Sequence, residues 1–131
     1  MKMNMRERRL LQICVGAGGL IPVSAGIAGI YLGPQFVDAA VSITADSHFR
    51  YLSGLLFGIG LLFWSAIPRI EASGKLFRIL TFLVFIGGLG RLWSLVAVGI
   101  PSLKMLSALA MELVVTPLLC WWQSRISKSR A

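Results

Sequence analysis

The sequence predicts an all-α protein, an integral membrane bundle of four membrane-spanning helices, and three observations carry that prediction. Hydrophobic residues make up 56% of the chain and charged residues 14%, whereas roughly a quarter of the residues of a soluble domain are charged. The mean hydropathy is +0.80. The apolar residues also form long runs without the alternating pattern of an outer-membrane strand.

Four apolar segments each have the length needed to cross a bilayer as a helix. They cover residues 10–32, 49–67, 76–98 and 103–123. Because an α-helix rises about 1.5 Å per residue, roughly 20 residues cross the hydrocarbon core. Short connections make successive helices antiparallel neighbours. We therefore expect a single four-span domain over residues 1–131.

The first segment also resembles a secretory signal peptide. The basic start MKMNMRERR precedes an apolar run that contains the small residues VSA, which would allow cleavage after Ala25. The apolar run continues well beyond Ala25, so we expect an uncleaved first span. Pro22 interrupts this span, which a membrane helix tolerates when neighbouring groups satisfy the freed carbonyl.

The basic residues predict the orientation of the spans. Residues 33–47, the first loop, contain no Lys or Arg, whereas both ends of the chain and the second loop are basic. The positive-inside rule therefore predicts an even number of spans with both termini in the cytoplasm. The predicted cytoplasmic cations are Lys2, Arg6, Arg8, Arg9, Arg69, Lys75, Arg78, Arg125, Lys128 and Arg130.

Several common functions have no support in the sequence. The net charge of +8 comes from short clusters that suit anionic lipids, and the chain has no basic face or fold signature that predicts nucleic-acid binding. Cys14 and Cys120 lie in apolar runs without a disulfide or metal spacing, so we expect buried free thiols. HExxH, GxSxG and P-loop motifs are absent, and no cofactor or metal is predicted.

Two charged residues lie deep inside predicted spans. Arg91 is about seven residues from Val98 at the outer end of the third span, and Glu112 is about nine residues from Leu103 in the fourth. Both therefore lie roughly 10–14 Å from the outer boundary. A charge at this depth costs a few kcal/mol to insert, so each should have a partner. We predict that Arg91 pairs with Glu112 across neighbouring helices.

The stretch TADSHFRYLSGLLFG, residues 44–58, brings further polar groups to the same half of the membrane. Asp46 and Arg50 are four positions apart and share a helix face, which Gly54 and Gly58 continue with little side-chain volume. We predict an outward-facing polar pocket that binds a lipophilic small molecule with an anionic or carbonyl head. Its predicted lining is Asp46, His48, Arg50, Arg91, Ser94 and Glu112.

Each of these residues also has a structural explanation. Asp46 can cap the start of the second span, and Arg50 can extend to lipid headgroups. His48 has no second His or Cys beside it, which favours a structural role over a metal ligand. Arg91 and Glu112 can form an interhelical staple that sets the register of the bundle.

Glycines predict where helices pack closely, because small residues let helix backbones approach in a membrane. Gly54 and Gly58 form a GxxxG pattern in the second span, which indicates a helix contact without identifying the partner helix. The third span adds Gly87, Gly88 and Gly90. The first span has a glycine-lined face, formed by Gly16, Gly19, Gly26 and Gly29.

Three sequence blocks resemble a bacterial family of small four-span membrane proteins known as domain of unknown function 4345. The blocks are DSHFRYLSG at residues 46–54, FIGGLGRLWS at 85–94 and MELVVTPLL at 111–119. The resemblance covers most of the chain after the first span. It implies an integral membrane bundle with no established activity, and we expect this bundle to lie in the bacterial inner membrane. It supports the positions already selected on physical grounds but assigns no role to them.

No reaction follows from these patterns. An enzyme would need an acid–base pair such as His48 and Glu112 within reach of the ligand, and the sequence does not guarantee that geometry. The first alternative to ligand binding is a small proton-coupled carrier, a homo-oligomer, in which Glu112 titrates. The second is a non-catalytic accessory subunit that docks a larger membrane partner through its GxxxG surfaces.

Overall fold

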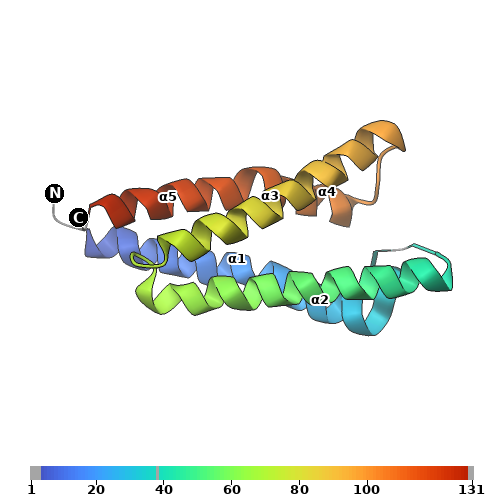
Figure 1. Ribbon diagram of the computed structural model, residues 1–131, viewed down its shortest axis with the longest axis horizontal. Coiled ribbons are helices and arrows are strands. Elements are labelled where there is room, and N and C mark those ends of the chain that lie inside the picture. Colours follow the sequence, from blue (N-terminus) through green and yellow to red (C-terminus); the bar gives the residue numbers. More distant parts are fainter. Residues whose placement is uncertain (1–3, 38, 130–131) are drawn as a thin grey trace.

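The computed structural model describes residues 4–37 and 39–129, and this part of the chain is helical apart from short connections. Lys2 and Arg130, two of the predicted cytoplasmic cations, lie outside the described residues. Figure 1 shows long helices lying roughly side by side. In chain order the elements are α1 (Met5–Leu32), the 3₁₀ turn η1 (Gly33–Val37), α2 (Ile43–Ala66), η2 (Ile67–Arg69), α3 (Gly74–Ala97), α4 (Leu103–Ala110), the π-helical turn η3 (Met111–Val115) and α5 (Thr116–Lys128).

The prediction of an all-α chain with four apolar segments of membrane-spanning length is confirmed. The four candidate spans are Met5–Val37, Ile43–Arg69, Gly74–Ala97 and Leu103–Lys128, the last of which joins α4, η3 and α5. The orientation of these spans in a membrane stays a prediction.

Capping residues explain why the first two helices begin earlier than the apolar runs do. Asn4 caps α1, since its side chain accepts a hydrogen bond from the backbone N–H of Arg6 at 3.1 Å. Ser42 caps α2 in the same way, and its hydroxyl accepts from the N–H of Ala45 at 3.3 Å. Short polar side chains satisfy the unpaired N–H groups of a first turn. Asp46 therefore lies inside the first turns of α2 and is not its cap.

Helices α1 and α2 form a tightly packed antiparallel hairpin (Figure 1). The packing depends on glycine, as the glycine-lined face of the first span predicted. A Cβ placed on Gly26 would lie 2.7 Å from the backbone nitrogen of Phe57, and one on Gly60 would lie 2.7 Å from a methyl group of Val23. Gly19 likewise makes room for the indole of Trp64, whose N–H donates to the carbonyl of Gly16 at 3.1 Å.

The apolar core lies at one end of the molecule, where the start of α1, the α2–α3 connection and the end of α5 meet. We call this the terminal end. Phe63 of α2 and Phe77 of α3 meet edge to face with ring centroids 5.0 Å apart. Gln123 is fully buried there and donates to the carbonyl of Ile70 at 2.7 Å. The core consists of Leu11, Val15, Phe63, Ala66, Ile70, Phe77, Leu80 and Ile126.

At the opposite end, which we call the far end, the two halves of the chain separate. Helix α3 diverges from α2 toward its C-terminal end (Figure 1), and its buried residues stop at Gly88. Helix α4 has no buried residue. Lys104, at the start of α4, nevertheless reaches across to η1, where its Nζ donates to the carbonyl of Phe36 at 2.9 Å. The far end is thus loosely packed but bridged.

Four of the five glycines predicted as packing positions in the second and third spans make no close contact among the described residues. A Cβ on any of them would meet nothing within 4 Å. The reason is helical geometry, because each lies one position away from a residue that does face the neighbouring helix. On α2, for example, the contacts with α1 are made by Ser53 and Phe57. The open glycines are Gly54, Gly58, Gly87 and Gly90.

One of the two cysteines is also one position away from a buried residue of its helix, and it is not buried as the sequence predicted. Cys14 is exposed on α1, next to the buried Val15, whereas Cys120 is half-buried, and both thiols are free. The prediction of a buried thiol was therefore wrong for Cys14.

Candidate functional site

The predicted pair between Arg91 and Glu112 is present and has two-pronged geometry. Nε of Arg91 donates to Oε2 of Glu112 at 3.0 Å, and Nη2 donates to Oε1 at 3.1 Å. Two parallel hydrogen bonds between a guanidinium and a carboxylate form one of the stronger charge-assisted contacts in proteins. The side chains of Arg91 and Glu112 are 29% and 16% exposed. The remaining guanidinium nitrogen, Nη1, lies 2.8 Å from Sδ of Met105.

Gly88 brings the two charged residues within reach of each other. It lies on α3 about one turn before Arg91, and a Cβ added to it would lie 2.9 Å from Cβ of Glu112 and 2.7 Å from Leu113. Only a residue without a side chain lets η3 approach α3 this closely. Gly88 is therefore the one of the five predicted packing glycines that makes a helix contact here.

Glu112 lies in a π-helical turn, η3, that interrupts the last span. Pro117 follows the turn and has no N–H to donate to the carbonyl four residues before it. The backbone N–H and the hydroxyl of Thr116 both donate to the carbonyl of Met111, five residues earlier, and the hydroxyl contact measures 2.9 Å. Isolated π turns inside α-helices are frequent at functional sites. This turn places Met111 and Glu112 at the wall of a cavity.

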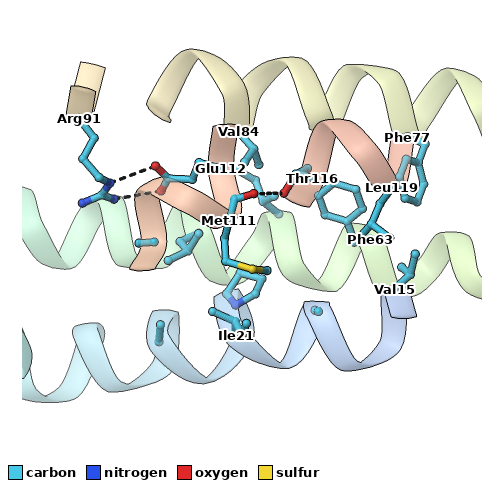
Figure 2. A pocket seen from close by; sticks show the side chains of 17 residues that line it. Val15, Ile21, Phe63, Phe77, Val84, Arg91, Met111, Glu112, Thr116 and Leu119 are labelled. Carbon is cyan, nitrogen blue, oxygen red and sulfur yellow. Dashed lines mark hydrogen bonds and ion pairs between the residues drawn. The ribbon is translucent and has the colours of Figure 1, made fainter. Parts of the chain in front are cut away.

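The cavity has a volume of about 130 Å³ and is lined by residues from all four candidate spans. Among its lining residues only Arg91 and Glu112 are charged. Figure 2 shows the charged pair at one end of the lining and Phe77, Leu119 and Val15 at the other. Between them, Met111 extends its side chain toward α1 beside Ile21 (Figure 2). The cavity is therefore an elongated apolar pocket with a polar end.

Asp46 and Arg50 form a second ion pair, but this pair does not line the cavity. Nε of Arg50 donates to Oδ2 of Asp46 at 2.8 Å, and Nη2 donates to Oδ1 at 3.2 Å. Nη1 donates to the carbonyls of Ile30 and Tyr31 at the end of α1. A cation at this position suits the unpaired carbonyls and the negative end of the helix dipole.

Gly33 makes that contact possible. Its φ of 63° is favourable only for a residue without Cβ, and an added Cβ would lie 2.6 Å from Nη2 of Arg50 and 2.7 Å from Oδ1 of Asp46. The pair therefore closes the C-terminal end of α1.

His48 and Ser94 lie on exposed faces of their helices, away from the cavity. His48 borders a shallow depression at the start of α2, and its ring lies 6.3 Å from that of Tyr51. Within the described residues, no hydrogen bond joins His48 to Glu112. The structure thus brings together two of the six residues predicted to line the pocket, Arg91 and Glu112, and does not place the other four with them.

Sequence reasoning did not identify Met105, Met111 or Thr116 as part of this site. The Thr-Pro dipeptide at residues 116–117 is a usable signal, because a proline inside a helix predicts a local irregularity. Met105 gave no such signal. A methionine in an apolar run is ordinary, and its contact with Arg91 depends on how α4 packs against α3.

The four candidate spans place this chain in the class of multi-pass membrane proteins. Residues 10–123 match the family described as Domain of unknown function (DUF4345), and because the match covers most of the chain, the protein belongs to that family. The family predicted from the three sequence blocks is thereby confirmed.

The chain is also similar to the GABA-specific permease of Saccharomyces cerevisiae, with 30% identity over 81 residues. The similarity covers 60% of this chain but only 14% of the permease, so the chain spans a small part of that protein. No solved structure matches the chain.

Proposed function

We propose that this protein binds a lipophilic molecule in the cavity between its helices, with the polar head of the molecule at Arg91 and Glu112 and its apolar part along the cavity. The observation that carries the proposal is the position of the ion pair at one end of an otherwise apolar cavity. Ligand pockets in proteins combine an apolar lining with a few polar groups that orient the ligand.

Energetics favour this proposal over a purely structural staple. An ion pair inside a membrane protein bears a desolvation cost that apolar side chains of similar size would avoid. A staple offsets that cost only when further hydrogen bonds satisfy all of its remaining donors and acceptors. Arg91 and Glu112 instead border a cavity, where a ligand can contact them.

The proposal includes a location. The basic residues favour the bacterial inner membrane with the terminal end in the cytoplasm, which places the polar end of the cavity in the outer half of the bilayer. Membrane lipids are then the first partners of the exposed apolar faces. The open glycines Gly54 and Gly58 offer a surface for a second copy or for a larger membrane partner.

A proton-coupled carrier is the second candidate, and the similarity to the yeast permease is what favours it. Because that similarity covers 14% of the permease, no substrate is transferred to this chain. A carrier must also expose Glu112 to each side of the membrane in turn. A cysteine placed at position 112, in a variant whose free Cys14 and Cys120 are replaced by alanine, is labelled from each side of sealed vesicles to test this requirement. Reactivity from one side only would contradict transport.

A photoreactive analogue of dodecanol, with a diazirine at the end of its tail, tests the binding proposal on the purified protein in a mild detergent. The expected labelling site is the apolar end of the cavity, at Val15, Phe63 and Leu119, identified by mass spectrometry. Gly18→Leu places a side chain in the cavity and should reduce this labelling about tenfold. The matched control is Gly54→Leu, which lies on an open face and should leave the labelling unchanged. Equal labelling of Val15, Phe63 and Leu119 in both variants would contradict the proposal.

A further inference from the structure

We propose that the first turn of α3 binds the headgroup of an anionic phospholipid that also carries a hydroxyl group, such as phosphatidylglycerol. In this site the phosphate accepts hydrogen bonds from the backbone of α3 and from Arg78, and the hydroxyl donates to Gln123. The site lies at the terminal end, and its residues do not line the cavity. The proposal is therefore independent of the ligand proposed for the cavity.

Helix α3 begins without a side-chain cap, whereas Asn4 caps α1 and Ser42 caps α2. Ser73 precedes α3, but its hydroxyl donates to the carbonyl of Arg69 at 2.9 Å. The first backbone N–H of α3 with an acceptor among the described residues is that of Phe77, which donates to the carbonyl of Ser73 at 2.9 Å. The N–H groups of residues 74–76 are therefore available, and such groups at a helix N-terminus bind phosphate.

Two cations flank this turn. Lys75 and Arg78 are both exposed, and the three ion pairs among the described residues all involve other arginines. Nη1 of Arg78 lies 3.8 Å from the position that a Cβ of Gly74 would occupy, because a helical side chain extends toward the N-terminus of its helix. Hydrogen bonds between a guanidinium and a phosphate are charge-assisted and strong. The start of α3 thus combines free N–H groups with two cations.

A buried amide indicates a second group on the ligand. Gln123 is fully buried and Nε2 donates to the carbonyl of Ile70, but Oε1 has no hydrogen-bond partner among the described residues. Oε1 lies 3.5 Å from the position of the same Gly74 Cβ. A buried acceptor without a donor is destabilising. A phosphodiester has no hydrogen to donate, and Lys75 and Arg78 repel an ammonium group. A hydroxyl on the headgroup supplies the donor.

The position of the turn identifies a lipid as the source of the phosphate. Gly74–Ala97 is a candidate span, so the first turn of α3 lies at a boundary of the bilayer, where lipid headgroups are located. Anionic headgroups attract basic residues at that level. The acyl chains of such a lipid can cover the exposed side chains of Ile79 and Phe82, which follow the site on α3.

Native mass spectrometry of the wild-type protein in detergent tests the headgroup. Phosphatidylglycerol is compared with phosphatidylmethanol, which is anionic but has no hydroxyl, and with zwitterionic phosphatidylcholine, all with the same acyl chains. We expect phosphatidylglycerol to bind at least about tenfold more tightly than phosphatidylcholine and about fivefold more tightly than phosphatidylmethanol, the effect of one hydrogen bond. Equal affinities for the two anionic lipids would show that the hydroxyl does not contact Gln123. Equal affinities for all three would refute the site, and so would displacement of the lipid by soluble glycerol phosphate.

A pair of arginine variants tests the location. Arg78→Gln should weaken binding of phosphatidylglycerol about fivefold, the effect of one cation near an anionic headgroup. Arg9→Gln removes an exposed cation of α1 and should leave the affinity unchanged. An equal loss in both variants would mean that the basic residues of this end attract anionic lipids without a defined site.

A pair of glycine variants tests the approach to the backbone. Gly74→Ala places a methyl group at ordinary contact distance from Gln123 and Arg78, so the helix should still fold. The methyl group covers the side from which the headgroup reaches the first turn, so binding of phosphatidylglycerol should weaken severalfold. Gly87→Ala, on an open face of the same helix, should leave it unchanged. Unchanged binding in both variants would contradict the proposal.

Discussion

Two arginine–carboxylate pairs with two-pronged geometry lie in different parts of the molecule, and their difference is informative. Asp46 and Arg50 are one turn apart on α2, whereas Arg91 and Glu112 join α3 to η3. Each arginine uses Nε and Nη2 to hold both oxygens of its carboxylate. The arginine and carboxylate side chains of the first pair are 40% and 36% exposed, respectively, against 29% and 16% for those of the second.

The two pairs differ most in what the third nitrogen of each arginine contacts. Nη1 of Arg50 donates to two backbone carbonyls at the end of α1, so every nitrogen of that guanidinium has a strong acceptor. Among the described residues, Nη1 of Arg91 has only the thioether of Met105 as a partner, at 2.8 Å. The first pair is complete as a helix cap. The second leaves one donor with a weak acceptor, and its two side chains line the cavity.

The largest expected effect comes from removing the carboxylate of the second pair. Glu112→Leu leaves the Arg91 charge without its partner, and losing one member of a buried pair costs about 3 kcal/mol or more. We expect the free energy of unfolding to fall by about that amount, measured by titrating the protein with sodium dodecyl sulfate in mixed micelles and following its helical circular dichroism.

Exchanging the charges is the control for this prediction. The double variant Arg91→Glu with Glu112→Arg keeps one cation and one anion at the same two positions, so it should recover most of the lost stability. It should still lose binding of the photoreactive dodecanol analogue, because the donor then projects from η3. If Glu112→Leu is as stable as the wild type, Arg91 is solvated in the protein and the cavity is not its environment.

Both ion pairs could be predicted from the sequence, because each depends on a regular helix. The spacing of Asp46 and Arg50 gives the first directly, and counting residues from the span ends gives the second. The length and hydropathy of the apolar runs likewise predicted the four spans, because the length of a regular helix follows from its number of residues.

The separation of the pairs into two sites could not be predicted, since it depends on where helices diverge. The cap on α1 requires the turn at Gly33, and the cavity depends on how helices from all four candidate spans pack around it. A sequence pattern specifies which face of a helix is small or polar but not the angle at which the helix crosses its neighbour. The sequence predicted one polar pocket. The structure instead has an apolar cavity that ends at Arg91 and Glu112, and a separate helix cap at Asp46 and Arg50.

A smaller effect is expected at the glycine that allows the second pair to form. Gly88→Ala places a methyl group 2.9 Å from Cβ of Glu112, and relieving such crowding costs about 1–2 kcal/mol. The matched control is Gly87→Ala, whose methyl group meets nothing within 4 Å and which should be neutral or slightly stabilising, because alanine is the better helix former. Equal effects of the two substitutions in the same unfolding titration would show that η3 does not pack on α3.

The cap formed by the first pair should contribute less, because Arg50 is more exposed. Arg50→Leu removes the donor from the carbonyls of Ile30 and Tyr31 and should lower the unfolding midpoint by less than Gly88→Ala does. It should leave labelling by the photoreactive analogue unchanged, and His48→Leu, on the exposed face of α2, is the matched control. Loss of labelling in Arg50→Leu would mean that both pairs serve one site, contrary to the comparison drawn between them.

The smallest expected effect concerns the turn that presents Glu112 to Arg91. Thr116→Val keeps the shape of the side chain but removes the hydroxyl that donates to the carbonyl of Met111. That carbonyl still accepts the backbone N–H of residue 116, so the loss should be about 0.5 kcal/mol. Ser65→Ala, which removes a hydroxyl bonded to a carbonyl in regular α2, provides the scale for such a loss. If Thr116→Val costs several times more, then the hydroxyl and not Pro117 maintains the π turn, and Thr116 is a positioning residue for the ion pair.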